Sequence, residues 1–366
     1  MNRSRLAIFR PVAAAVAFAG ALLCAPALAD SAVVAANGTI YEVFPANYGD
    51  LIPLPGGSPE TTMPALGLRI SPSGQPSRLE LIDGTADYER EGSVSVEFEE
   101  TTGTLFVAFT KSRGIAADMH VTVRRDGVWY AHDVLSNAGQ YYLSINPKVV
   151  VTRQRYTTFG ADGAVVTKSR SIFSLVWWEE SGPSQARYAP IFVEDGELRT
   201  DAVQAWNLNA LAGAEGPTDS SGYPTSAYSH PGVQADPASN GGVLVTFANL
   251  FTRTQQVLHI GFPDDLVKIS PPGSTRVPDE DWSRGHFPIG RSGGGGRIPI
   301  SMTTSSEIGA TVSQAGVTTF YWVDEGTVRF VRSDDPEDAA PRRLALRPDL
   351  SAEKATALVK ALAEKN

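Results

Sequence analysis

The chain has almost no cysteine and has one long apolar run. Cys24 is the single cysteine among 366 residues, and it lies in an N-terminal stretch that we expect to be removed. An exported chain without disulfides must be stabilised by its core alone. After residue 29 no apolar run approaches the roughly 20 residues needed to cross a bilayer. We therefore expect no membrane insertion once the N-terminal stretch has been removed.

The first 29 residues have the features of a secretory signal peptide. Arg3, Arg5 and Arg10 form a basic start, an Ala/Val/Leu-rich stretch follows, and Ala27-Leu28-Ala29 supplies small residues for cleavage. A lipoprotein signal is disfavoured, because Leu23 stands where a small residue should precede the cysteine. The pattern predicts cleavage after Ala29 and a periplasmic or secreted protein.

Basic residues are in deficit. The formal net charge is −9, from 31 basic and 40 acidic residues, and loss of the three signal-peptide arginines makes it −12. This balance argues against nucleic acid and against anionic membrane surfaces as partners, because both attract basic proteins. It is compatible with cationic or neutral ligands and with metal.

Motifs for several kinds of chemistry are missing. None of the histidines is spaced as in a zinc site, no Gly-x-Ser-x-Gly elbow of a serine hydrolase occurs, and "SGGGGR" lacks the ending of a phosphate loop. Acidic clusters lie in expected turns but have no EF-hand spacing. We expect no cofactor, and structural calcium remains an open alternative that no motif supports.

A repeated unit of four short strands is present instead. Its clearest copy spans residues 93–135, with strands expected at 93–98, 104–110, 119–124 and 128–135. Further copies are expected at 146–208, 230–270 and 308–346, and part of one at 38–83. In each full copy the second strand is the most apolar ("LFVAF", "FSLVWW", "VLVTF", "TTFYWV"), as in a strand buried on both faces.

Units of this length with turns at fixed places are typical of a β-propeller. We predict an all-β propeller of five to six four-stranded blades in one domain, residues 30–346, followed by a C-terminal helix or tail at 347–366. Residues 156–168 are interpreted as an inserted hairpin, and 271–300 as an irregular stretch that could hide a divergent blade. A pair of β-sandwich domains is the alternative fold.

The phrases "NPKVVV…SLVWWEES…FVEDGEL", "HPGVQADPASNGGVLVTFANL" and "RISPSGQPSRLELI" resemble blades of the sialidase-like, BNR-repeat bacterial propellers. The resemblance covers about residues 66–346, although the Asp box Ser-x-Asp-x-Gly-x-Thr-Trp is nowhere complete. It implies a site with three arginines, a Tyr/Glu pair and an acid. Arg297, in Arg297-Ile298-Pro299, and Tyr188 with Glu179 or Glu180 are the positions it suggests. The remaining arginines would come from residues 113, 153, 155, 187 and 291.

The best candidate for a ligand loop is the segment 276–297, because long irregular stretches in compact domains are functional or disordered. Its candidate binding residues are Trp282, Arg284, His286, Arg291 and Arg297. Weaker candidates are Trp178, Glu179 and Tyr188. We assign no catalytic residue.

The sequence thus favours an exported module that binds a protein or a glycan in the cell envelope or outside the cell. The alternative is a sialidase-like glycoside hydrolase, in which arginines converge at the centre of the ring. A third hypothesis is a metal-stabilised structural role in the envelope.

Overall fold

The computed structural model describes the chain with gaps. The described residues are 32–52, 62–85, 94–113, 116–134, 143–180, 185–199, 204–211, 228–249, 254–268, 285–297, 308–312, 318–324, 327–332, 335, 340 and 342–345. The expected signal peptide and the expected C-terminal helix lie outside them. Within them the chain is mostly β. The short helical elements are α2 (Tyr48–Leu51), α3 (Leu208–Leu211) and η3 (Leu266–Lys268).

The strands form successive antiparallel meanders. The first is β1 (Ala32–Ala36), β2 (Thr39–Asn47), β3 (Pro64–Pro72) and β4 (Arg78–Leu81). The second is β5 (Val94–Glu99), β6 (Thr104–Arg113), β7 (Ala116–Arg125) and β8 (Val128–Val134). The third is β9 (Leu143–Phe159), β10 (Val165–Glu180), β11 (Gln185–Glu194) and β12 (Glu197–Arg199), with β13 (Trp206–Asn207) also on β11.

Two further meanders follow along the chain. The fourth is β14 (Tyr228–Ala235), β15 (Val243–Asn249), β16 (Thr254–Gly261) and β17 (Ile289–Arg297). The fifth is β18 (Ile308–Val312), β19 (Thr318–Asp324), β20 (Thr327–Arg332) and β21 (Arg342–Ala345). A parallel pair, Ala117 with Leu143, joins the second and third meanders into one nine-stranded sheet.

Tight turns explain why neighbouring strands pair within each meander. Asn37-Gly38, Asp126-Gly127 and Asp195-Gly196 each place two successive residues at positive φ. This conformation matches the twist of the flanking strands and is favoured by Asn-Gly and Asp-Gly. The turns expected at residues 125–127 and 194–197 are therefore confirmed.

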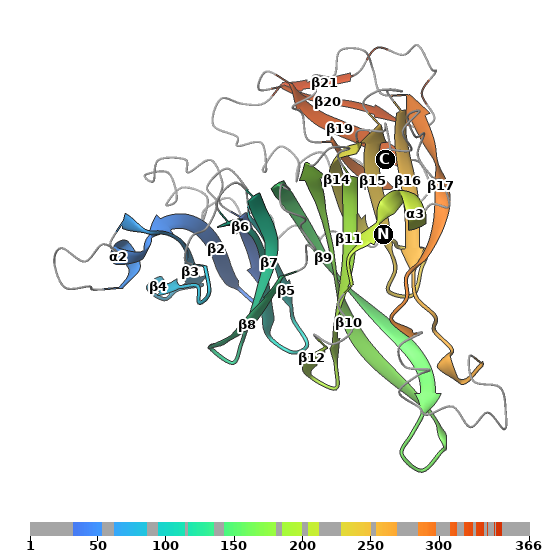
Figure 1. Ribbon diagram of the computed structural model, residues 1–366, viewed down its shortest axis with the longest axis horizontal. Coiled ribbons are helices and arrows are strands. Elements are labelled where there is room, and N and C mark those ends of the chain that lie inside the picture. The colour runs from blue at the N-terminus through green and yellow to red at the C-terminus, as the bar shows by residue number, and fades with distance from the viewer. Residues whose placement is uncertain are drawn as a thin grey trace, which may run out of the picture.

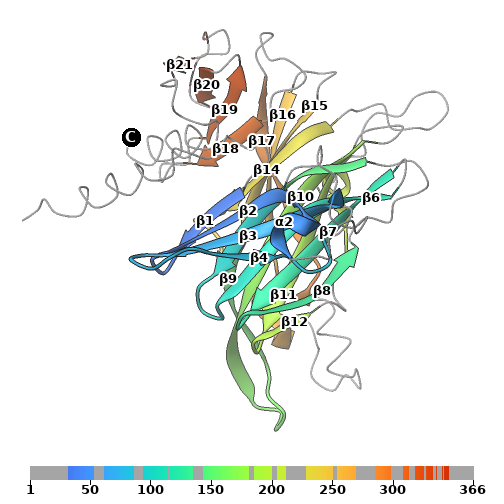
Figure 2. The same ribbon diagram turned by 90° about the vertical axis from the view of Figure 1, so that its left-hand side faces the viewer.

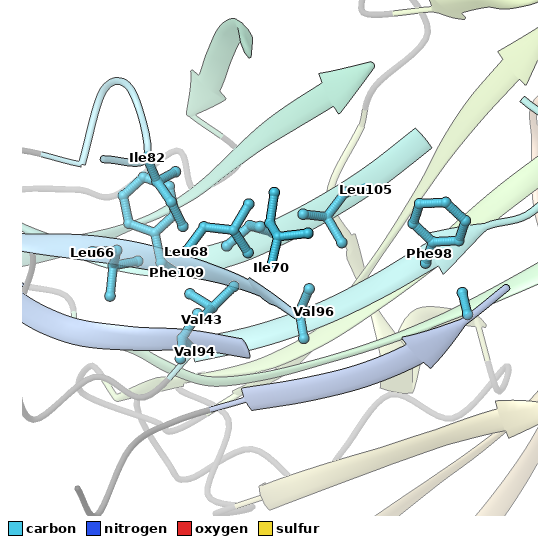
Figure 3. Packing of buried hydrophobic residues seen from close by; sticks show 12 residues of the cluster. Val43, Leu66, Leu68, Ile70, Ile82, Val94, Val96, Phe98, Leu105 and Phe109 are labelled. Atoms are coloured by element: carbon cyan, nitrogen blue, oxygen red, sulfur yellow. The ribbon is translucent and has the colours of Figure 1, made fainter. Parts of the chain in front are cut away.

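The sheets stack face to face in chain order, from the blue strands at the left of Figure 1 to the orange and red strands at the upper right. Val43 and Leu68 of the first meander pack against Val96 and Leu105 of the second (Figure 3). Across this interface Arg124 Nε and Nη2 donate to the two carboxylate oxygens of Glu80, each at 2.9 Å.

Both faces of the third meander are buried. One face packs on the second meander through a cluster that includes Phe106, Phe173 and Trp177. The other packs on the fourth meander through a cluster that includes Tyr188 and Val245. This double burial is the reason that the second strand of the unit, β10, has a continuous apolar run.

The first strands of the meanders lie next to one another. β1 contacts β5, β5 contacts β9, β9 contacts β14, and β14 contacts β18. The meanders therefore fan out from a shared row of first strands, as blades do from the centre of a propeller.

The structure corrects two of the expected fourth strands and confirms an expected hairpin. Residues 266–270 were expected as the fourth strand of their unit, but Leu266–Lys268 is a 3-10 turn and β17 takes that place beside β16. The glycine run 293–296 is accordingly part of a strand. Residues 199–208 are not one strand, since β12 and β13 pair separately with β11. The hairpin expected at residues 156–168 is present, as the outer end of the long β9–β10 hairpin.

Candidate functional site

The predicted ligand loop is partly strand. Of its candidates, Trp282 and Arg284 lie outside the described residues. His286 is buried, and Arg291 is exposed on β17, opposite His259 of β16. Arg297 ends β17, where its backbone is paired with that of Thr254. From residue 289 onward the expected loop is therefore the strand β17.

His286 belongs to a buried charged cluster, which we call the Arg170 cluster and define as Arg170, Glu194, His286 and Gln154. Arg170 Nη1 lies 3.0 Å from Glu194 Oε1, and His286 Nε2 lies 3.2 Å from the same oxygen. Arg170 Nη2 donates to the Gly285 carbonyl at 2.7 Å. The cluster thus joins β10 and β11 to the segment that leads into β17.

Gln154 extends the cluster to another part of the fourth meander. Its Oε1 accepts from Arg170 Nε at 2.8 Å, and its Nε2 donates to the carbonyls of Phe262 and Pro263, each at 3.1 Å. The Gln154 amide therefore links Arg170 Nε to two backbone carbonyls just after β16. A buried network paired to this extent favours one arrangement of the packed elements, although Glu194 Oε2 makes no hydrogen bond and lies 3.6 Å from Arg199 Nη1.

Aromatic rings enclose the guanidinium. The Arg170 Cζ atom lies 4.9 Å from the centre of the Tyr156 ring, 4.6 Å from that of Phe192 and 5.8 Å from that of Phe262. Burial lowers the pKa of Arg170, and the hydrogen bond that Arg170 donates to Glu194 opposes that shift. Burial also raises the pKa of the Tyr156 hydroxyl, and the negative charge of Glu194 raises it further.

The role of the Arg170 cluster is to hold neighbouring segments in place. Its charges are balanced by one another and shielded from solvent, so a substrate has no access to them. Among the described residues no group of three or more His, Cys, Asp or Glu side chains could hold a metal ion. The cluster fixes where residues 285–288 lie.

Beside the Arg170 cluster lies an aromatic pair, Phe287 and Trp206. Phe287 follows His286 directly, and its side chain is 44% exposed. Its ring meets that of Trp206 edge to face, with centroids 5.6 Å apart. Gly290 lets this segment approach α3, because a Cβ there would lie 2.2 Å from the Leu211 carbonyl oxygen. The site thus presents a rigid aromatic side chain to solvent.

The weaker candidates do not converge. Tyr188 is buried on the face of β11 that packs on the fourth meander, and its hydroxyl lies 3.1 Å from that of Ser174. Glu179 faces the opposite side of the sheet and accepts from Arg187 Nε at 2.8 Å. Trp178 lies on β10, on the face opposite to Glu179, and is partly exposed. A Tyr188–Glu179 pair is therefore not formed.

Sequence reasoning missed Arg170, Gln154 and Glu194. Glu194 was interpreted only as a turn residue, and Arg170 and Gln154 were unremarkable in polar stretches of long strands. A weak signal existed, since Arg170 lies two residues before Ile172, where the apolar run of β10 starts. Only the register, which pairs Arg170 with both Glu194 and Gln154, shows their role.

Comparison with solved structures finds remote similarity only. A triple arginine-to-alanine mutant of AofleA from Arthrobotrys oligospora is 10% identical, with 86% of this chain and 70% of that chain covered and a TM-score of 0.39. An endo-arabinase from Bacteroides thetaiotaomicron is 10% identical, with 87% and 93% covered and a TM-score of 0.29. Hydrazine synthase from Kuenenia stuttgartiensis is 13% identical, with 83% of each chain covered and a TM-score of 0.35.

These similarities do not carry an argument about function, because every TM-score is below 0.5 and two of the names give different activities. No protein-family model and no curated protein matches the chain. In the described part of the chain no helix has the length and apolar character needed to span a bilayer.

Proposed function

We propose that the chain is an exported β-propeller of five to six blades that binds a protein or glycan ligand outside the cytoplasm. The propeller is supported by the antiparallel meanders that stack in chain order with their first strands adjacent. The BNR-like turn pattern and the N-terminal signal pattern support the finer assignment to an exported protein of the sialidase-like type.

The observation that carries the binding role is the Phe287–Trp206 pair. Phe287 is exposed, yet the Arg170 cluster and the close approach at Gly290 fix the backbone on both sides of it. A rigid aromatic side chain loses little conformational entropy on binding and supplies a large apolar surface. We place ligand contact at this pair. Arg291, exposed nearby on β17, is a further candidate contact.

The alternative, a sialidase-like glycosidase, has less support. It requires a tyrosine that can act as a nucleophile, and Tyr188 is buried, with a pKa raised by burial, on the face opposite to Glu179. We propose no cofactor for either function, because neither uses one.

A panel of immobilised neutral and acidic oligosaccharides, together with purified envelope proteins, tests the proposal with residues 30–366. Phe287→Ala should weaken binding about tenfold or more, as truncation of an aromatic anchor does. Tyr130→Ala is the matched control, since Tyr130 is 49% exposed on β8, in another meander. Equal binding by wild type and Phe287→Ala, or shortening of a bound oligosaccharide, would overturn the proposal.

A further inference from the structure

One face of the fourth meander packs on the third, and the other face carries His259. Leu258 belongs to the core shared with the third meander, so His259, the next residue of β16, points to the opposite face. Leu244 and Val257 of that face pack with Val331 of β20. Figure 2 shows β19, β20 and β21 of the fifth meander at the top of the molecule. The fifth meander covers this face only in part, because the His259 side chain is 44% exposed.

The His259 ring is held by a buried carboxylate. Its Nδ1 lies 2.9 Å from Asp236 Oδ2, and the Asp236 side chain is 6% exposed. The other carboxylate oxygen of Asp236 accepts from the Ala238 N–H at 2.9 Å. Because a carboxylate accepts hydrogen bonds, Nδ1 carries the hydrogen of this contact, and Nε2 is the ring nitrogen left for a ligand.

The turn between β14 and β15, which carries Asp236, is fixed to β9 of the third meander. The Thr152 hydroxyl donates to the Gly241 carbonyl at 2.7 Å. The Asn240 side chain bonds the backbone of Arg155 twice, accepting from its N–H at 3.0 Å and donating to its carbonyl at 2.6 Å. The carboxylate therefore orients the imidazole before any ligand arrives, which lowers the entropic cost of binding.

Arg291 lies beside His259. The two residues are directly opposite on β17 and β16, which places their Cβ atoms about 4.5–5.5 Å apart. Arg291 is exposed, and it forms no ion pair with any residue that the structure describes. Gly290, the residue before it, meets Leu211 of α3 on the other face, so Arg291 points away from α3. The guanidinium is therefore available beside the imidazole.

The surface next to this pair is open and apolar. Gly261 and Ile289 are directly opposite on β16 and β17, on the same face as His259 and Arg291. Ile289 is 47% exposed. A Cβ on Gly261 would meet nothing within 4 Å, and a glycine inside a strand often marks a place where a ligand approaches the backbone.

We propose that these residues form a binding site for a neutral sugar ring that carries two adjacent hydroxyl groups. We call it the His259 site and define it as Asp236, His259, Gly261, Ile289 and Arg291. One hydroxyl pairs with His259 Nε2, and Arg291 donates to the oxygen of the next hydroxyl through its planar fork. The C–H face of the sugar lies over Gly261 against Ile289, since apolar surface lines most small-molecule sites. Asp236 is a positioning residue, because it acts only through His259.

A hydroxyl suits this site better than an anion or a metal ion. It can donate to Nε2 of a neutral imidazole or accept from Nε2–H of a charged one, so it fits both protonation states. A carboxylate fits only the charged ring, because it presents acceptors alone. The positive charge of Arg291 repels a divalent cation at the same nitrogen.

NMR of isotope-labelled histidine rings in residues 30–366 tests the proposal, with methyl glycosides of glucose, galactose, mannose, xylose and arabinose as probes. We expect at least one glycoside to shift the Nε2 signal of His259 until it saturates, with the signal assigned by its loss in His259→Gln. Arg291→Ala should weaken that binding about tenfold or more, because it removes hydrogen bonds from a charged donor. Arg78→Ala is the control, since it removes an exposed arginine of β4 and should keep the wild-type affinity.

Asp236→Ala tests the positioning role in the same spectra. It should move the hydrogen of the His259 ring towards the other tautomer and weaken sugar binding about threefold or more, because Nδ1 loses its acceptor. A tautomer and an affinity that both stay unchanged would refute this role.

The proposal is overturned if no glycoside shifts the His259 signals, if Arg291→Ala leaves the affinity unchanged, or if galacturonate binds and the neutral glycosides do not. The His259 site does not depend on the Phe287–Trp206 pair, so Phe287→Ala should leave the His259 titration unchanged. Failure here and failure of the proposed function are therefore distinguishable, because the imidazole signal reports on the His259 site alone.

Discussion

The Arg170 guanidinium and the Glu194 carboxylate lie 3.0 Å apart where neither side chain reaches solvent. Removing two charges from water costs several kcal/mol for each, and the attraction between them repays this only when the remaining donors and acceptors are satisfied. Here Gln154 accepts from Arg170 Nε and the Gly285 carbonyl accepts from Nη2, while Glu194 Oε2 makes no hydrogen bond and lies 3.6 Å from Arg199 Nη1. The pair therefore orders residues 285–288 without serving as a reactive group.

Arg170→Met should destabilise the fold by about 3–5 kcal/mol, because Glu194 would remain buried without its counter-charge. Urea unfolding followed by fluorescence measures the change. Arg78→Met is the control, since it removes an exposed arginine 3.4 Å from Glu80, and it should cost less than about 1 kcal/mol. A similar cost for both variants would show that the Arg170 cluster does not stabilise the protein.

Gly241→Ala should cost more than Gly74→Ala. Both glycines have positive φ, 78° and 72°, so each alanine carries the strain of about 1–2 kcal/mol of that conformation. A Cβ at Gly74 meets nothing within 4 Å, whereas one at Gly241 would lie 2.6 Å from the Gln154 Cβ. We expect about 1 kcal/mol or more of extra loss for Gly241→Ala. Equal losses in thermal unfolding would contradict the packing of this turn on β9.

Gly290→Ala should loosen α3 from β17, because the added Cβ would overlap the Leu211 carbonyl. A cost of about 1–3 kcal/mol is typical of overpacking. Gly261→Ala lies on the neighbouring strand with nothing within 4 Å of the added atom, and it should be nearly neutral. Chemical denaturation of the two variants side by side gives the comparison, and a neutral Gly290→Ala would refute the close approach.

Stability should fall in alkaline solution through Tyr156 and Tyr188. Burial raises the pKa of both hydroxyls in the folded state, so the unfolded chain loses these protons first, near pH 10. Their contribution is complete below that pH and declines as the pH rises above it. Tyr188→Phe loses the hydrogen bond to Ser174 but should show a shallower alkaline decline than wild type. Urea titrations between pH 9 and pH 11 measure it, and an unchanged slope would contradict the assignment.

Much of the fold could be predicted from the sequence. The strands at 93–98, 104–110, 119–124 and 128–135 correspond to β5–β8, because Asp126-Gly127 fixes a turn and apolar residues fill both faces of β6. The fourth strand of the next-to-last unit was misplaced at 266–270. Leu266 is apolar as a strand residue would be, but it is buried under Gly285. A glycine-rich strand such as β17 has no apolar alternation by which it could be recognised.

The candidate site was only partly accessible from the sequence. His286 and Arg291 were chosen from one irregular stretch, but His286 turns inward to Glu194 while Arg291 is exposed. Phe287, the residue between them that we place in contact with ligand, was not among the candidates. Its partner Trp206 is distant in the sequence, and their meeting depends on how β13 and the lead-in to β17 pack together, which no local pattern encodes.

We propose that Phe287 anchors a ligand that the protein leaves intact. Saturation-transfer NMR on a ligand found by the panel, with its chain length followed in the same tube, tests this most directly. We predict transfer to the ligand with wild-type protein and with Tyr130→Ala, loss of transfer with Phe287→Ala, and constant ligand length throughout. Progressive shortening of the ligand, or undiminished transfer with Phe287→Ala, would contradict the account.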